Sequence, residues 1–234
     1  MTTAAARFPT TGLSLVARLG SEEREVRIAA FDRVVELYWK PIYKYLRLAH
    51  RKSSDDAKDL TQSFLAYALE KDFLAAYDPA KARFRAYLRM CADRFAANDA
   101  KAASRQKRGG GAEHVDFDAA ENELTAGSGA EPDVVFEREW IRALFERAVA
   151  IVRERWQGKP ALLAFERYDL GGEPRPSYQE IADELRVPLT TVTNHLAAVR
   201  RDFRAVALDI LRETTATDDE FRDEARRLFG SKAV

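Results

Sequence analysis

The residues best suited to chemistry lie between Tyr178 and Arg201, in the stretch YQEIADELRVPLTTVTNHLAAVRR. If a helix begins near Leu189, one of its faces carries short or hydrogen-bonding side chains, namely Thr190, Thr193, Asn194, Ala197 and Arg201. Such side chains can contact the edges of bases in a DNA groove, and an asparagine can bind adenine through two hydrogen bonds. Phosphate contacts are the expected role of Arg200, Arg201 and Arg204. The pattern therefore indicates recognition of DNA.

Two helices joined by a tight turn must position these residues. The opposite face of the second helix carries Val192, Leu196, Val199 and Phe203, and it can pack on Ile181, Ala182 and Leu185 of the first helix. The turn falls at Arg186-Val187-Pro188, which predicts a helix-turn-helix. Arg186 takes the place where glycine often adopts a left-handed conformation, at a cost of about 1–2 kcal/mol for another residue. An ordinary helical hairpin without a DNA-binding role is the alternative.

The rest of the chain also has helical periodicity, and no alternating apolar run indicates a sheet. We therefore expect an all-α fold. One long helix should follow Asp78-Pro79, with Phe84, Leu88, Cys91 and Phe95 on its apolar face. A second stripe of this helix carries Arg94, Asn98, Lys101 and Arg105 at steps of four, three and four. Cations beside an aromatic core suit the binding of separated DNA strands, although a solvated helix face is the alternative.

The chain divides into two expected helical domains joined by a Gly-rich acidic linker. The expected boundaries are an N-terminal extension at 1–26, a first domain at 27–108, the linker at 109–133, a second domain at 134–213 and a helical tail at 214–234. The tail is either regulatory or a cap on the second domain, and we favour the cap. The 234 residues carry a formal net charge of zero, so any contact with nucleic acid must come from local clusters.

Other classes of protein find little support in the sequence. The single cysteine, Cys91, cannot form an internal disulfide. The first residues lack the basic start and apolar core typical of a signal peptide, and no apolar run approaches the roughly 20 residues of a membrane-spanning helix. We therefore expect a cytoplasmic protein without membrane contact. His50, His114 and His195 show no metal-ligand spacing with Cys91. No pair of acids stands out as catalytic, so we expect neither an enzyme nor a cofactor or metal.

Three motifs in order give the chain a resemblance to a known family. DDAKDLTQSF (residues 55–64), FRAYL followed by CADR (residues 84–94) and the helix-turn-helix at 178–201 are similar to segments of the extracytoplasmic-function sigma factors of bacterial RNA polymerase. The similarity covers residues 27–212 in order. FPTT near the start, QKRGGG before the linker and EFRDEARRLFG in the tail resemble a subgroup of these factors.

The resemblance implies partners and site residues. Core RNA polymerase would bind through its two largest subunits, and the first domain would contact it with Asp56, Asp59, Leu60, Gln62 and Phe64, of which Leu60 or Phe64 also serves the core. The stripe from Arg94 to Arg105 would bind the minus-ten element of promoter DNA. The face around Asn194 would bind the minus-thirty-five element. Whether an anti-sigma protein also binds stays open.

Several positions depart from the family pattern. Asp93-Arg94 stands where the family usually has Arg-Asn, and Thr193, Asn194, Ala197 and Ala198 replace its usual mixtures of Arg, Ser and aromatic residues. Two alternatives therefore stay open beside a sigma factor. One is a stand-alone helix-turn-helix regulator that binds DNA without polymerase. The other is a sigma-like adaptor that sequesters polymerase and does not bind DNA.

Overall fold

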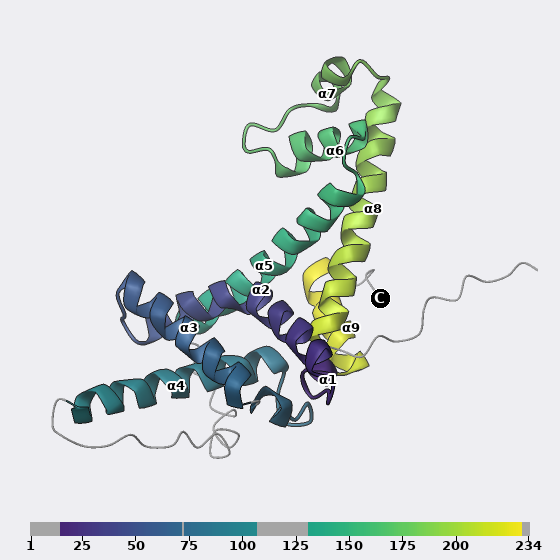
Figure 1. The fold of residues 1–234 in the computed structure, drawn as a ribbon. Helices are drawn as coiled ribbons and strands as arrows, with labels where there is room; N and C mark the ends of the chain where they lie inside the picture. Colours follow the sequence, from purple (N-terminus) through teal and green to yellow (C-terminus); the bar gives the residue numbers. More distant parts are fainter. Residues whose placement is uncertain (1–14, 72, 107–130, 231–234) are drawn as a thin grey trace, which may run out of the picture. The chain divides into compact units, whose positions relative to one another are not determined.

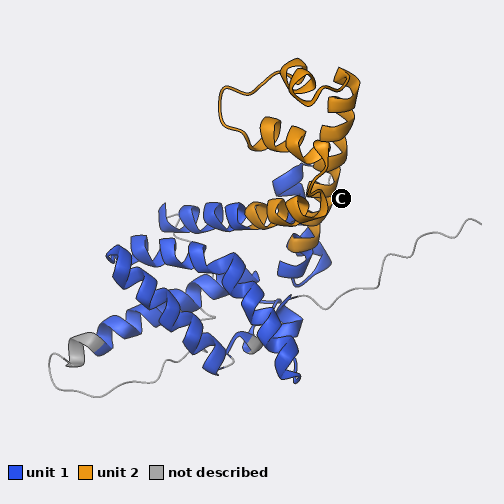
Figure 2. Ribbon diagram, turned by 45° about the horizontal axis from the view of Figure 1, so that its top comes forward, with its two compact units in different colours: residues 1–143, 211–234 blue, residues 144–210 orange. Residues whose placement is uncertain are grey.

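The computed structural model describes residues 15–71, 73–106 and 131–230. Within these ranges the chain forms nine α-helices and no strand (Figure 1), which confirms the all-α prediction. The chain groups into two compact units, coloured in Figure 2, and each is described by itself.

Unit 1 contains residues 1–143 and 211–234, so the chain leaves this unit and returns to it. Its elements are α1 (Leu15–Leu19), α2 (Arg24–Ala49), α3 (Ser54–Lys71), η1 (Phe73–Ala76), α4 (Phe84–Gln106), the first part of α5 (Glu131–Arg155), the end of α8 (Leu189–Thr214) and α9 (Asp218–Phe229).

Helices α2, α3 and α4 pack on one another and enclose most of the core of unit 1. The helix periodicity explains this packing, because the apolar residues of each helix recur on one face. Phe64 of α3 lies against Phe73 and Phe95, with ring centroids 6.0 and 5.7 Å apart. The largest fully buried side chains of these three helices are Leu37, Tyr38, Ile42, Leu46, Phe64, Phe84 and Leu88.

A side chain caps the start of α3, whereas the start of α4 differs from the sequence prediction. The Ser53 hydroxyl accepts a hydrogen bond from the Asp56 N–H at 3.1 Å, as expected of a helix cap. Asp78-Pro79, by contrast, does not begin a helix. The Asp78 carboxylate accepts from the Ala80 N–H at 2.9 Å and so closes a local turn, and α4 begins only at Phe84.

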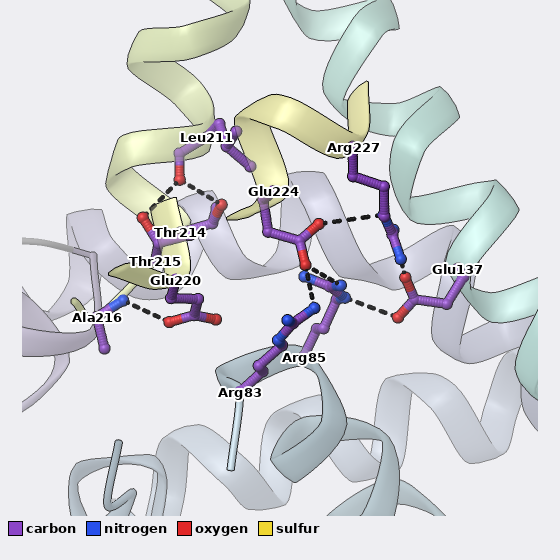
Figure 3. Close-up of polar contacts among 10 residues, drawn as sticks. All are labelled: Arg83, Arg85, Glu137, Leu211, Thr214, Thr215, Ala216, Glu220, Glu224 and Arg227. Carbon is purple, nitrogen blue, oxygen red and sulfur yellow. Dashed lines mark hydrogen bonds and ion pairs between the residues drawn. The ribbon is translucent and has the colours of Figure 1, made fainter. Parts of the chain in front are cut away.

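Helix α9 joins unit 1 through charged groups that are buried (Figure 3). Glu224 is fully buried, and its Oε1 lies 2.7 Å from Nη2 of Arg85 on α4. Arg83 also donates to this carboxylate. The tail groups with unit 1, and its Arg227 donates to Glu137 of α5 at 2.8 Å.

Unit 2 contains residues 144–210. The rest of α5 enters it, followed by α6 (Pro160–Phe165), the π-helical turn η3 (Glu166–Leu170), α7 (Tyr178–Leu185) and the first part of α8. Its core contains Leu144, Val152, Phe165, Ile181, Val192, Leu196 and Val199. Residues 134–143 and 211–213, which the sequence analysis assigns to the second domain, group with unit 1.

Candidate nucleic-acid interface

The first helix of the helix-turn-helix begins with a reciprocal cap. The Ser177 hydroxyl accepts from the Glu180 N–H at 3.2 Å, and the Glu180 carboxylate accepts from the Ser177 N–H at 2.6 Å. This capping box satisfies two backbone donors that the helix start would leave unpaired. The pKa of Glu180 is lowered, chiefly by the hydrogen bond from the Ser177 backbone. Helix α7 therefore starts at Tyr178, the first residue of the predicted stretch.

The turn between the helices has the left-handed residue that the sequence predicts at Arg186, with φ 55° and ψ 45°. The N–H groups of Arg186 and Val187 both donate to the Ala182 carbonyl, which closes the end of α7. Pro188 comes next, and its missing N–H costs little because α8 begins at the residue after it. Two helices joined by a tight turn are thus present where the sequence predicts them.

Helix α8 has the two faces expected from the sequence. Val192, Leu196 and Val199 are buried, while Phe203 is half-buried and lies near Phe145 and Phe165. The residues predicted to contact base edges are all exposed: Thr190, Thr193, Asn194, Ala197 and Arg201. The Thr193 hydroxyl donates to the Leu189 carbonyl at 3.3 Å, so it still has lone pairs for an outside donor.

The three arginines predicted to hold phosphates differ in their surroundings. Arg200 is engaged inside unit 2: its Nε and Nη2 lie 2.8 and 2.9 Å from the two oxygens of Asp169, and its guanidinium lies 5.3 Å from the Tyr168 ring. The hydrogen bonds to Asp169 raise the pKa of Arg200. Arg200 therefore fastens η3 to α8. Arg201 is exposed and Arg204 is half-buried.

A hollow of about 480 Å³ adjoins the exposed face of α8. Besides Arg201 it is lined by Arg155 and Lys159, two cations that the sequence analysis missed. Asp202 organises its wall, accepting from Trp156 Nε1 at 2.8 Å and from Arg155 at 3.0 Å. Arg155 and Asp202 are 47 positions apart in the chain, so only the packing of α5 on α8 brings them together. Such cations can hold the phosphates beside a helix that lies in a groove.

The predicted minus-ten stripe lies on α4 in unit 1. Arg94 and Asn98 are half-buried and Lys101 is exposed. The side chain of Arg105 lies outside the described residues. The neighbouring departure from the family pattern, Asp93, accepts from the Tyr45 hydroxyl at 3.2 Å and lies 2.8 Å from His50 Nε2.

The five residues predicted to bind polymerase separate into two groups on α3. Asp56, Asp59 and Gln62 are exposed, with Asp56 accepting from the Ser53 hydroxyl at 2.8 Å. Leu60 and Phe64 are 6% and 0% exposed. These two side chains are core residues, because the same face of α3 packs on its neighbours in unit 1, and only the polar three lie at the surface.

Two other kinds of feature are absent from the described part of the chain. Within it, no group of three or more His, Cys, Asp or Glu side chains is placed to hold a metal ion. No helix in the same ranges is long and apolar enough to cross a membrane.

Comparison of the chain with protein-family models, with curated proteins and with solved structures finds no match in any of the three. The resemblance to sigma factors therefore rests on the three motifs quoted from the sequence.

Proposed function

We propose that the chain binds DNA sequence-specifically through α8 and acts as a sigma-type initiation factor that directs RNA polymerase to promoters. The observation that carries the DNA-binding part is the geometry of α7 and α8. A capped helix, a left-handed turn and a second helix with a buried apolar face leave Thr193, Asn194 and Arg201 exposed together. This is the arrangement by which a recognition helix contacts base edges in the major groove.

The polymerase-binding part rests on the order of the motifs. The exposed polar residues of α3 come first, the basic stripe of α4 is second, and the helix-turn-helix comes last, in the order that the sigma resemblance implies. Asp56, Asp59 and Gln62 would contact the polymerase. The stripe on α4 would hold the opened minus-ten strand, and the chemistry of RNA synthesis would be the polymerase's own.

Run-off transcription with purified core RNA polymerase and genomic fragments tests the proposal. We expect specific transcripts that depend on the protein and that disappear for Asn194→Ala, because an asparagine–base pair contributes about 1–3 kcal/mol of discrimination. Gln179→Ala is the matched control, since Gln179 is also an exposed polar residue but lies on α7. It should leave the transcripts unchanged.

The same experiment distinguishes the two alternatives. Binding to core polymerase without any specific transcript would contradict promoter recognition and favour the sequestering adaptor. Specific DNA binding without any binding to polymerase would contradict the sigma function and favour a stand-alone regulator.

A further inference from the structure

A strongly basic hollow of about 660 Å³ lies in unit 1, between the C-terminal end of α2, the turn after it and the start of α5. One carboxylate, that of Glu131, lines it together with five cations: Lys44, Arg47, Arg51, Lys52 and Arg138. The chain as a whole has a formal net charge of zero. The excess of positive charge in the hollow is therefore a local feature, and it favours an anionic ligand.

Only part of this charge is balanced from within the protein. Lys44 Nζ lies 2.7 Å from Oε1 of the buried Glu139, and Arg138 Nε lies 3.9 Å from the same oxygen. Burial alone would raise the pKa of Glu139, but the hydrogen bond from Lys44 lowers it. Among the described residues, the structure gives no ion pair to the other three cations, Arg47, Arg51 and Lys52.

Arg51 closes the C-terminal end of α2 in a left-handed conformation. Arg51 has φ 49°, in the left-handed region, where a residue with a side chain is strained by about 1–2 kcal/mol and glycine is not. The turn between α2 and α3 would form more easily with glycine. The Lys52 N–H donates to the Arg47 carbonyl at 3.1 Å as the helix ends, and the Arg51 side chain lines the hollow.

An aromatic pair continues the site along α2. Trp39 and Tyr43 stack with their ring centroids 5.4 Å apart and their planes 15° apart, and both are half-buried. The pKa of Tyr43 is lowered, chiefly by the hydrogen bond with Ser54 and also by the charge of Arg47. Successive steps of four residues place Trp39, Tyr43 and Arg47 along one side of the helix.

We propose that this hollow and the adjoining aromatic pair bind single-stranded nucleic acid, with Arg47, Arg51 and Lys52 holding phosphates and Trp39 stacking on a base. Cations that line the path of the backbone beside aromatic rings are what strand binding without sequence preference requires. Arginine suits phosphate because its planar donors match two oxygens at once. The site shares no residue with the stripe on α4 or with the exposed face of α8, and it does not depend on promoter recognition.

Fluorescence anisotropy with a labelled 20-nucleotide oligothymidine, the full-length protein and no polymerase tests the proposal. We expect the triple variant Arg47→Gln/Arg51→Gln/Lys52→Gln to bind at least about 10-fold more weakly. The slope of log K against log salt concentration should also be shallower by about 2 for this variant. Each phosphate contact to a single strand contributes about 0.7 to that slope, and the variant removes three such contacts. Trp39→Leu should weaken binding about 5-fold or more and leave the slope unchanged, because stacking releases no counterions.

The matched control is Arg24→Gln/Lys71→Gln/Arg222→Gln, which removes three exposed cations of unit 1 that lie outside the hollow. Binding and salt slope should stay as in the unchanged protein. Thermal unfolding followed by circular dichroism establishes that each variant is folded.

Three results would overturn the proposal. The first is an unchanged protein that does not bind the oligonucleotide. The second is an equal loss of binding in the control and in the hollow variant. The third is a combination of two observations: polyglutamate of equal charge displaces the oligonucleotide, and Trp39→Leu has no effect on binding. This combination would assign the hollow to an acidic protein partner.

Discussion

Glu224 is a carboxylate with no exposed surface, and it depends on its neighbours for solvation. Arg85 supplies a hydrogen bond at 2.7 Å, and the Arg85 guanidinium also lies 4.5 Å from the Trp140 ring. Burial alone would raise the pKa of the neighbouring Glu137, but the charge of Arg85 lowers it. These residues bring α4, α5 and α9 together (Figure 3), so the charges form one network whose members need one another.

Glu224→Gln should therefore lower the free energy of unfolding by about 3–5 kcal/mol, because it removes one of the two carboxylates that balance the buried Arg85 charge and leaves only Glu137. Asp223→Asn is the matched control on the same helix, since Asp223 is exposed and should change stability by less than about 0.5 kcal/mol. Urea unfolding measures both. A loss for Glu224→Gln as small as that of Asp223→Asn would contradict the importance of the network.

Asp93 gives unit 1 a pH dependence whose sign can be worked out. Its pKa is lowered, chiefly by the hydrogen bond from His50, so the folded chain prefers the charged form. The stabilisation is then present above the pKa of an unfolded aspartate, about 3.9, and is lost as the pH falls through the lower folded value. Since the Asp93 side chain is 46% exposed, this contribution to the free energy of unfolding should be below about 1 kcal/mol.

Asp93→Asn should accordingly lower the free energy of unfolding at about pH 6 and have less effect below about pH 4. Urea unfolding at the two pH values checks this, with the exposed Asp99→Asn on the same helix as the control. If the difference in the free energy of unfolding between Asp93→Asn and the unchanged protein instead grew as the pH fell, the prediction would be contradicted.

Single residues also mark the limit of prediction from sequence. The exposure of Asn194 and the burial of Val199 follow from helix periodicity, and the structure confirms both. The engagement of Arg200 by Asp169 could not be predicted, because these residues are 31 positions apart and meet only when η3 packs on α8. Arg85 was missed for the same reason, since its partner Glu224 is 139 positions away.

At the scale of elements, local chemistry predicts the helix ends where a side chain caps the backbone. Arg186 ends α7 at the turn that the sequence indicates, and the Ser177 hydroxyl caps its start. Asp78-Pro79 shows why such signals also fail, because an aspartate can cap either a helix or a turn. Whether Asp78 caps a helix or a turn depends on how the residues after Pro79 pack. The aspartate alone does not determine this choice.

The loop between η3 and α7 contains a pair of adjacent glycines with different constraints. A Cβ on Gly171 would lie 2.4 Å from the Arg167 carbonyl oxygen, whereas a Cβ on Gly172 would meet nothing within 4 Å. Gly171→Ala should lower the free energy of unfolding by about 1–3 kcal/mol, because the backbone of η3 must shift. Gly172→Ala, the control, should be neutral or slightly stabilising. Thermal unfolding compares them, and equal effects would contradict the role of Gly171.

Arg186 offers a test of the turn itself. Arg186→Gly should raise the stability of unit 2 by about 0.5–1 kcal/mol, because glycine relieves the left-handed strain but loses more entropy on folding. Arg186→Val should lower it, since a β-branched residue tolerates positive φ poorly. Hydrogen exchange of the buried amides of α7 measures both changes. A stabilising Arg186→Val would show that the turn is not left-handed in solution.

At the scale of the whole molecule, the tail is part of unit 1. Deleting residues 216–234 removes α9 and leaves Arg85 without the Glu224 carboxylate. We expect the amides of α4 to exchange much faster with solvent, while those of α7 in unit 2 keep their protection. Equal loss of protection in both helices would mean that the units unfold as one body.

The return of the chain to unit 1 also determines when that unit can form during synthesis. All of unit 2, residues 144–210, is made before residues 211–230 complete the network around Glu224. Domains usually fold in order from the N-terminus as they leave the ribosome. Here all residues of the second unit are made before the first unit is complete. Arg85 can pair with Glu224 only after the last part of the chain has been translated. A chain that ends after residue 210 would therefore contain α7 and most of α8 but an incomplete first unit.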